Sequence, residues 1–173
     1  MINFDKAQEI LGADNLADCL DRFDTVDPFN HLRVEGWICR QGTHRYGALI
    51  LDRIEGEEVE PQRIWGTPKF HYPFGKTQTG ERSYHWPQKV SEGAVYLKLD
   101  GTNVLVFSYQ YNGIRRVSAK TRLTPFLSES TFGNFLAMWQ RMVALHPEIM
   151  QPPEGFAMAC LLYTSPSPRD RQK

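Results

Sequence analysis

The strongest constraint on the fold is the dipeptide Asn112-Gly113, which separates two strand-like runs. These runs cover residues 104–111 and 114–119 and contain several Val and Tyr residues, which are residue types that favour strands. A two-residue turn of type I′ requires positive φ at both central positions, and Asn-Gly accepts that conformation readily. The sequence therefore predicts a β-hairpin at this point.

Strand-like segments recur through much of the chain. Short runs of strand-forming residues, separated by turn residues, lie at 32–39, 45–52, 63–65 and 95–99 in addition to the hairpin. The stretch 73–93 is rich in Gly, Thr, Ser and charged residues and is typical of a surface loop. We therefore expect a mostly antiparallel, β-rich body.

Two other segments have helical periodicity. In residues 5–23 apolar side chains recur at helical spacing, which predicts one helix or two short ones interrupted at Gly12. A second helix is predicted to begin within 128–131, where hydroxyl side chains can cap it, and to end at His146. The predicted fold class is α+β, with mostly antiparallel β-sheets and flanking helices.

The composition is that of an ordinary globular domain, and it argues against a membrane protein, a zinc site and a disulfide framework. Hydrophobic residues make up 41% of the 173 residues, enough for one domain with a substantial core. No apolar run is long enough to cross a bilayer and no signal peptide is found, so we expect no membrane contact and a cytoplasmic location. The cysteines have no CxxC spacing, which argues against a zinc site or a disulfide framework. The formal net charge is zero and neither supports nor excludes a nucleic-acid partner.

Residues 94–107 are the most informative about function. Lys98 lies in a strand-like stretch, and with Asp100 and Gly101 it forms a KxDG pattern. A free lysine has a pKa of about 10.4, so a lysine that attacks phosphorus needs neighbouring cations or partial burial. On an extended chain Asp100 shares the face of Lys98, and Gly101 permits a sharp turn. The alternative is a plain hairpin turn with a solvated lysine.

The segments on either side of Lys98 favour a nucleotide-binding interpretation. Upstream, Arg45 opens a predicted strand and Pro68-Lys69-Phe70 completes a basic block, and downstream the segment 117–122 contains Lys120. In this order and spacing, residues 45–122 resemble the phage-type RNA ligases of the covalent nucleotidyltransferase superfamily.

This resemblance implies an ATP-dependent RNA ligase and the adenylation domain of that family. Lys98 would take AMP from ATP as a lysyl-AMP intermediate, the AMP would pass to a 5′-phosphate end, and the neighbouring 3′-hydroxyl would displace it. The implied cofactors are ATP and Mg²⁺, with the metal held by phosphate oxygens and water. The implied partners are RNA ends, or DNA ends, and the implied state is a monomer. Besides the catalytic Lys98, the resemblance assigns the nucleotide contacts to Arg45, Lys69, Phe70, Asp100, Gly101 and Lys120.

Three other interpretations stay open. The KxDG pattern alone does not separate an RNA ligase from a DNA ligase or a capping guanylyltransferase. A non-catalytic β-rich binding module, in which residues 98–101 form only a hairpin, is the alternative from a different class. A cleft shared by Lys98 and Lys69 distinguishes the ligase from the module, because a hairpin does not require Pro68-Lys69-Phe70.

The C-terminal residues 160–173 differ in character from the rest. Read back into codons, Cys160 to Asp170 match a commonly used transposase-end sequencing adapter. We therefore interpret 160–173 as a non-native, disordered tail and 1–159 as the N-terminal part of an adenylation domain; a genuine disordered tail is the alternative. The later motifs of the family, which are an acidic strand residue, an EGxV-type stretch and a closing lysine pair, are not found in the sequence. We expect the chain as printed to be inactive or poorly active.

Overall fold

The computed structural model describes residues 1–13, 15–69, 74–84, 89, 91–94, 96, 101–130 and 133–162. Over these residues the chain has an α+β fold with mostly antiparallel sheets and two α-helices. None of the helices found there is long and apolar enough to span a membrane. The predicted fold class is confirmed at this level.

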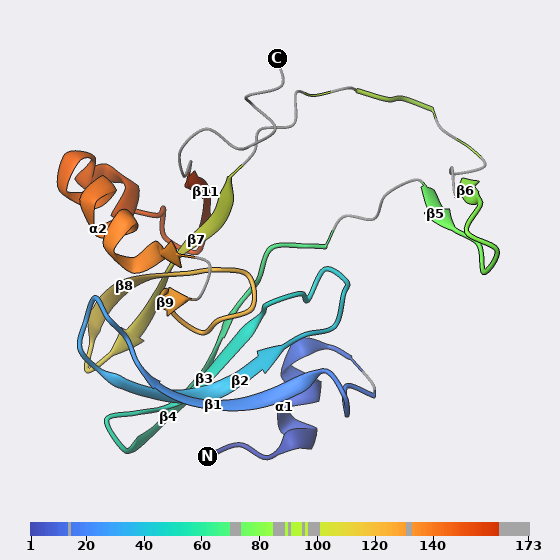
Figure 1. Ribbon diagram of the computed structural model, residues 1–173. Helices are drawn as coiled ribbons and strands as arrows, with labels where there is room; N and C mark the ends of the chain where they lie inside the picture. Colours follow the sequence, from blue (N-terminus) through green and yellow to red (C-terminus); the bar gives the residue numbers. More distant parts are fainter. Residues whose placement is uncertain are drawn as a thin grey trace.

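Two larger sheets form the body (Figure 1). The first sheet follows the chain order and pairs each strand with the next one antiparallel. The second sheet places the last strand beside the hairpin, in the order β11-β7-β8. The strands of the first sheet are β1 (Leu20–Val26), β2 (Arg33–Cys39), β3 (Leu49–Ile54) and β4 (Glu57–Ile64), and those of the second are β7 (Thr102–Tyr111), β8 (Ile114–Lys120) and β11 (Met158–Leu162).

Apolar clusters hold these sheets and the helices in layers. Side chains of both sheets, among them Leu51 and Phe107, form one core between the sheets. On the other face of the first sheet lies α1 (Phe4–Leu11), and on the other face of the second lies α2 (Phe135–Leu145), followed by the 3₁₀ turn η1 (Pro147–Met150) (Figure 1). Burial of each Leu, Ile or Phe side chain contributes roughly 1.5–3 kcal/mol.

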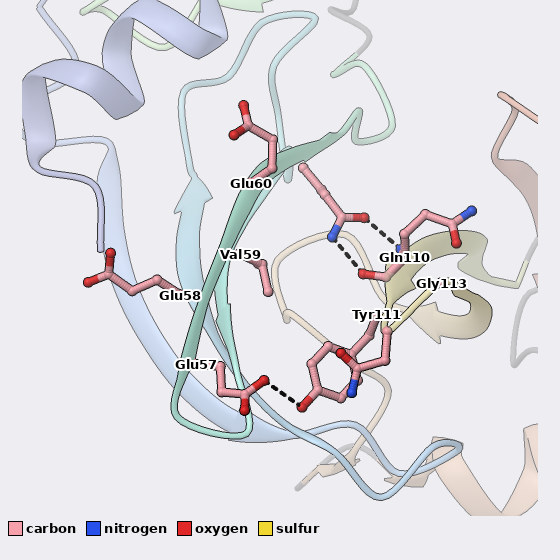
Figure 2. Close-up of a pocket in the computed structure, with 9 residues that line it drawn as sticks. Glu57, Glu58, Val59, Glu60, Gln110, Tyr111 and Gly113 are labelled. Carbon is pink, nitrogen blue, oxygen red and sulfur yellow. Dashed lines mark hydrogen bonds between the residues drawn. The ribbon is translucent and has the colours of Figure 1, made fainter.

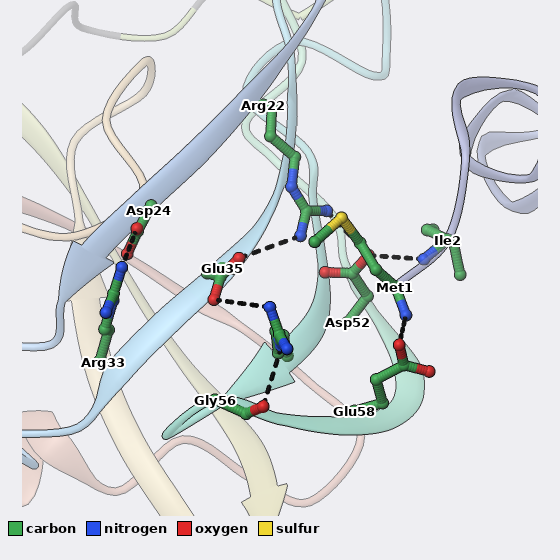
Figure 3. Close-up of polar contacts among 10 residues, drawn as sticks. Met1, Ile2, Arg22, Asp24, Arg33, Glu35, Asp52, Gly56 and Glu58 are labelled. Carbon is green, nitrogen blue, oxygen red and sulfur yellow. Dashed lines mark hydrogen bonds and ion pairs between the residues drawn. The ribbon is translucent and has the colours of Figure 1, made fainter.

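Polar contacts fasten the N-terminus to the first sheet (Figure 3). The Met1 amine lies 2.5 Å from a Glu58 carboxylate oxygen, and the backbone N–H of Ile2 donates to Asp52 Oδ2 over 2.9 Å. Asp52 is buried and also accepts a hydrogen bond from Arg22 at 2.7 Å. These contacts tie the residues that precede α1 to β3 and β4 of the first sheet.

The hairpin predicted from Asn112-Gly113 is confirmed. Tyr111 pairs with Ile114 across the turn, and φ is 52° at Asn112 and 72° at Gly113. Both central residues therefore adopt the left-handed conformation that a type I′ turn requires.

The helix predicted over 5–23 is wrong in its second half. The helix α1 ends at Leu11, and Gly12 adopts a left-handed C-cap with φ of 61°, a frequent way for helices to end. Residues 20–23 belong instead to β1, where Leu20 pairs with Cys39. The apolar side chains of this segment recur at helical spacing because they are buried against the sheet. Burial by tertiary packing can produce such a spacing without a helix.

Several strands and the second helix begin at residues other than those predicted from the sequence. The strand predicted at 45–52 begins at Leu49 and the strand predicted at 63–65 begins at Glu57, as part of β4. The second helix begins at Phe135, because Asn134 caps it by accepting from the backbone N–H of Ala137 over 2.8 Å. The residues before this helix form a short pair of strands, β9 (Glu129–Ser130) and β10 (Gly133–Asn134).

The remaining expectations concern two regions. Part of the predicted loop 73–93 forms the hairpin of β5 (Phe74–Lys76) and β6 (Arg82–Tyr84). Of the strand predicted at 95–99, only Tyr96 lies among the described residues, and it is not in a strand. The first three residues of the segment 160–173, expected to be disordered, lie in β11 and pair with β7, because Leu162 reaches the core. Residues 163–173 lie outside the described residues.

Candidate functional site

Two glycines allow three segments distant in sequence to meet at one end of the sheets. Gly47 has φ of +81°, and a Cβ placed on it would lie 1.9 Å from the carbonyl oxygen of Arg122. A Cβ on Gly66 would lie 2.2 Å from the carbonyl oxygen of Tyr46. Because no side chain fits at either position, the loop 40–48, the segment 65–69 and the end of β8 are packed backbone against backbone.

Lys120 lies at the centre of this junction. It is the last residue of β8 and is fully buried. Its Nζ donates to the carbonyl oxygens of Gly47 at 2.8 Å and of Thr121 and Arg122 at 3.1 Å each. Burial lowers the pKa of the Lys120 ammonium to about 7, although three carbonyl acceptors favour its charged form. An ammonium has three protons, so the junction satisfies all of them.

An open depression of about 400 Å³ lies beside the junction. It brings together the loop before β3, the start of β7 and the residues that follow β8. We call it the Tyr46 depression; its lining consists of Tyr46, Gly101, Thr102, Asn103, Thr121, Arg122 and Leu123.

Two cations flank the ring of Tyr46. The Lys69 Nζ lies 5.3 Å from the ring centroid, and the Arg122 guanidinium carbon lies 5.6 Å from it. Both distances are within the range of cation–π attraction. In the part of the chain that the structure describes, neither cation has a carboxylate partner, and the buried Arg122 Nε has no hydrogen-bond acceptor. The depression therefore offers positive charge.

A hydrogen bond fixes the segment with Lys69 to the segment that follows the KxDG pattern. The Thr67 hydroxyl donates to Asn103 Oδ1 over 2.9 Å, and the backbone N–H of Lys69 donates to the carbonyl of Thr43 over 3.2 Å. The side chain of Lys69 passes over Gly42, where a Cβ would lie 3.2 Å from its Cδ. Residues 67–69 are thus held between the loop 40–48 and the start of β7.

The structure brings together Lys69, Gly101 and Lys120 of the predicted site. Gly101 lines the Tyr46 depression with φ of +138°, and Lys69 lies against the ring of Tyr46. Lys120 lies beneath the depression, with its ammonium directed at backbone carbonyls. The predicted contact of Lys120 with nucleotide oxygens stays a prediction.

Arg45 lies in the same loop but its side chain contacts the end of α1. Its Nε donates to the carbonyl of Leu11 over 2.8 Å, and its terminal nitrogen donates to the carbonyl of Gly12. It therefore caps the carboxyl end of the helix, where a cation is favourable. Lys98, Phe70 and Asp100 lie outside the described residues, so their assigned roles stay predictions.

The sequence analysis missed Tyr46, Thr67 and Asn103 as members of the site. Tyr46 stands between a basic residue and a glycine, and this is the signal that could have identified it: an aromatic ring beside a close backbone approach. No comparable signal distinguishes Thr67 and Asn103, because their hydrogen bond joins positions 36 residues apart.

A second depression, of about 420 Å³, lies between β4 and the hairpin turn of β7 and β8 (Figure 2). The Glu57 carboxylate of β4 faces the turn and accepts a hydrogen bond from the Tyr111 hydroxyl at 3.4 Å, whereas the Glu58 carboxylate points away and pairs with the Met1 amine. The Gln62 side chain bridges the two sides by donating to the carbonyl of Gln110 over 2.8 Å and accepting from its backbone N–H over 2.6 Å. Carboxylates repel phosphate, so an anionic ligand is expected at the Tyr46 depression and not here.

Among the residues that the structure describes, no group of three or more His, Cys, Asp or Glu side chains is placed to hold a metal ion. Comparisons of this chain with protein-family models, with curated proteins and with solved structures found no match.

Proposed function

We propose that this chain is the N-terminal part of an ATP-dependent RNA ligase and that its Tyr46 depression receives the phosphates of ATP. One observation carries the proposal: Gly101, three residues after Lys98, lines the same depression as Tyr46, and Lys69 lies against the Tyr46 ring. Three residues of chain reach at most roughly 11 Å, which is short enough for the KxDG lysine to serve this depression. A plain hairpin does not require the segment containing Lys69 at the same place.

The proposed reaction is an attack of the Lys98 amine on the α-phosphorus of ATP. A nitrogen–phosphorus bond forms, the bond to the pyrophosphate oxygen breaks, and the amine proton passes to solvent. Lys69 and Arg122 supply positive charge, which lowers the pKa of a nearby lysine and offsets the charge that develops on the phosphates. Transfer of AMP to a 5′-phosphate and its displacement by a 3′-hydroxyl rest on the family resemblance alone.

The residues around the depression fit a nucleotide triphosphate. Arg122 lines the depression, and a guanidinium binds phosphate oxygens strongly through charge-assisted hydrogen bonds. The described residues offer no carboxylate cluster for magnesium, so the ion would be held by phosphate oxygens and water, as is common for Mg²⁺.

A non-catalytic binding module is the second candidate. The observation that favours it is the saturation of Lys120, whose ammonium protons are all used by backbone carbonyls. This contact explains Lys120 as a structural residue without any nucleotide. A module of this kind would bind phosphate-containing ligands at Tyr46 but form no covalent adduct.

The first experiment is to read the source DNA past the codon for Ala159 with a library that uses no transposase adapter. The protein encoded by the recovered frame is then incubated with Mg²⁺ and ATP labelled at the α-phosphate. We expect an acid-labile, alkali-stable label that maps to Lys98 and is absent from the Lys98→Arg variant. Lys6, an exposed lysine of α1, provides the matched control variant Lys6→Arg, which is expected to keep the label.

The outcomes separate the interpretations. Labelling from GTP instead of ATP favours a capping guanylyltransferase, and sealing of nicked DNA in preference to RNA favours a DNA ligase. Reversible ATP binding without a covalent label in the protein from the recovered frame overturns the ligase proposal in favour of the binding module.

A further inference from the structure

A third, smaller hollow lies at the end of β4, separate from the Tyr46 depression and from the depression beside Glu57. Its volume is about 180 Å³, below the roughly 300–1,000 Å³ of pockets for drug-sized ligands, and it therefore suits a single planar ring. We call it the Trp65 hollow; its lining consists of Arg63, Ile64, Trp65, Phe107, Ser108, Gly155, Phe156 and Ala157.

Two aromatic residues of this lining are exposed to solvent. Trp65 is 41% exposed and Phe156 is 71% exposed. Phe156 is presented by a turn in which its backbone N–H donates to the carbonyl of Pro153 over 3.1 Å, and Gly155 has φ of +76°. Large apolar rings that are exposed at a hollow are typical of a binding surface.

The side chains of Arg63 and His44 lie beside the Trp65 ring. The Arg63 guanidinium carbon lies 4.3 Å from the centroid of the Trp65 ring, and an Arg63 terminal nitrogen donates to the carbonyl of Ile10 over 2.9 Å. The ring of His44 lies 6.2 Å from that of Trp65. Aromatic rings accompanied by arginine are the means by which proteins bind single-stranded nucleic acid, because bases stack on the rings and cations neutralise the phosphates.

The Trp65 hollow and the Tyr46 depression lie along the same strand and the same loop. Asn103 of β7 lines the depression, and Phe107, four residues further along the same face of the strand, lines the hollow. At about 3.3 Å per residue, these positions are roughly 13 Å apart along the strand. The loop 40–48 carries His44 beside Trp65 and Tyr46 in the depression.

We propose that the Trp65 hollow binds an unpaired base of a single-stranded nucleic acid whose phosphate backbone continues toward the Tyr46 depression. The base would contact Phe156 and Trp65, and Arg63 would neutralise a neighbouring phosphate. A duplex is excluded as the occupant because its bases are stacked on one another and offer no free face to the rings. The choice of nucleic acid as the occupant rests on the proposed function.

The test is fluorescence anisotropy with a labelled single strand of about 10 nucleotides, without ATP. Phe156→Ala and Trp65→Ala are each expected to weaken binding about tenfold or more, because stacking on one ring carries a large share of the affinity for a base. Trp65→Phe keeps a ring and is expected to keep most of the affinity. Leu145→Ala is the matched control, since Leu145 is 73% exposed at the end of α2 and outside the lining.

The outcomes separate this inference from the proposed function. If Lys98 is labelled by ATP but Phe156→Ala and Trp65→Ala bind the strand like the unchanged protein, the inference is overturned and the ligase proposal stands. If no label forms but both variants lose affinity for the strand, the hollow is a nucleic-acid site of a binding module. Oligoribonucleotides and oligodeoxyribonucleotides are compared to identify the strand, and thermal melting verifies that each variant is folded.

Discussion

Asp27 and Lys120 are both fully buried, and each is held by hydrogen bonds with no oppositely charged partner among the residues that the structure describes. Asp27 accepts hydrogen bonds from the side chains of Tyr109, Ser118 and Asn30 at 2.7–2.8 Å and from the backbone N–H of Phe29 at 2.9 Å. Lys120 donates only to backbone carbonyls. Ser118 and Lys120 are two residues apart on β8, so one face of one strand serves both sites.

The difference between the two lies in what surrounds the charge. The donors of Asp27 are mostly side chains of β7, β8 and the link between β1 and β2, and they close over it. Burial and the Asp27 carboxylate raise the pKa of Tyr109, so the donated proton stays in place at neutral pH. The partners of Lys120 belong to segments that continue into the Tyr46 depression. We infer that the Asp27 site stabilises the fold, whereas the Lys120 site shapes a surface on which a ligand can bind.

The largest effect is expected at Asp27. The substitution Asp27→Ala removes the acceptor of two buried hydroxyls, those of Tyr109 and Ser118, and of two part-buried N–H donors, and should lower the free energy of unfolding by about 3–5 kcal/mol. Asp24→Ala is the control, because Asp24 forms an exposed ion pair with Arg33 and its loss should barely change stability. Urea denaturation measures both, and equal effects of the two substitutions would contradict the structural role given to Asp27.

A smaller loss of stability is expected at Gly47, whose carbonyl accepts a hydrogen bond from Lys120. Gly47→Ala should lower the free energy of unfolding by about 2–4 kcal/mol, because it adds a clash with Arg122 to the strain of a left-handed conformation. Gly56→Ala is a close control, since Gly56 also has φ of +81° but a Cβ placed on it would have no atom within 4 Å. It should cost only the strain, about 1–2 kcal/mol. If Gly47→Ala and Gly56→Ala lower the free energy of unfolding equally, the close backbone contact at Gly47 is contradicted.

The two sites should also differ in their response to pH. In the unfolded chain the Lys120 amine keeps its proton to about pH 10.5, whereas the folded protein releases it near pH 7. Between these values the unfolded state binds more protons, so the contribution of Lys120 makes stability rise with pH, by up to about 1.4 kcal/mol per unit. Denaturation from pH 7 to 9.5 should show this slope, and Lys120→Met should lack it. A slope that persists in Lys120→Met would assign it to another group.

The smallest effect on stability, and the clearest effect on binding, is expected at Lys69. Lys69→Ala should leave the melting temperature unchanged, because the side chain is exposed, and should weaken binding of inorganic tripolyphosphate about tenfold. Titration calorimetry measures the affinity, with Lys6→Ala as the control on α1. Loss of affinity in both variants would indicate a general charge effect instead of a site.

Local patterns in the sequence were sufficient for the hairpin at Asn112-Gly113 and for the antiparallel sheets, because turn chemistry and strand propensity act over a few residues. They were not sufficient at Leu20, where the register with β2 overrides a helical spacing. In the site, the resemblance assigns Lys69 and Gly101 to one nucleotide; Lys69 lies against the Tyr46 ring and Gly101 lines the same depression, and their shared contact with a nucleotide stays a prediction. The capping role of Arg45 and the contact of Lys120 with the Gly47 carbonyl could not be predicted, because each joins segments more than 30 residues apart.

Arg45, Tyr46 and Gly47 are consecutive, yet each faces a different part of the molecule. Arg45 holds the end of α1, Tyr46 lines the depression, and Gly47 accepts a hydrogen bond from Lys120. A ligand that orders Tyr46 must also restrict its two neighbours, since they share one backbone. Amide hydrogen exchange at the last turn of α1, on the far side of the first sheet, should therefore slow when the depression is filled, and the N-terminal helix would act as a remote reporter of occupancy.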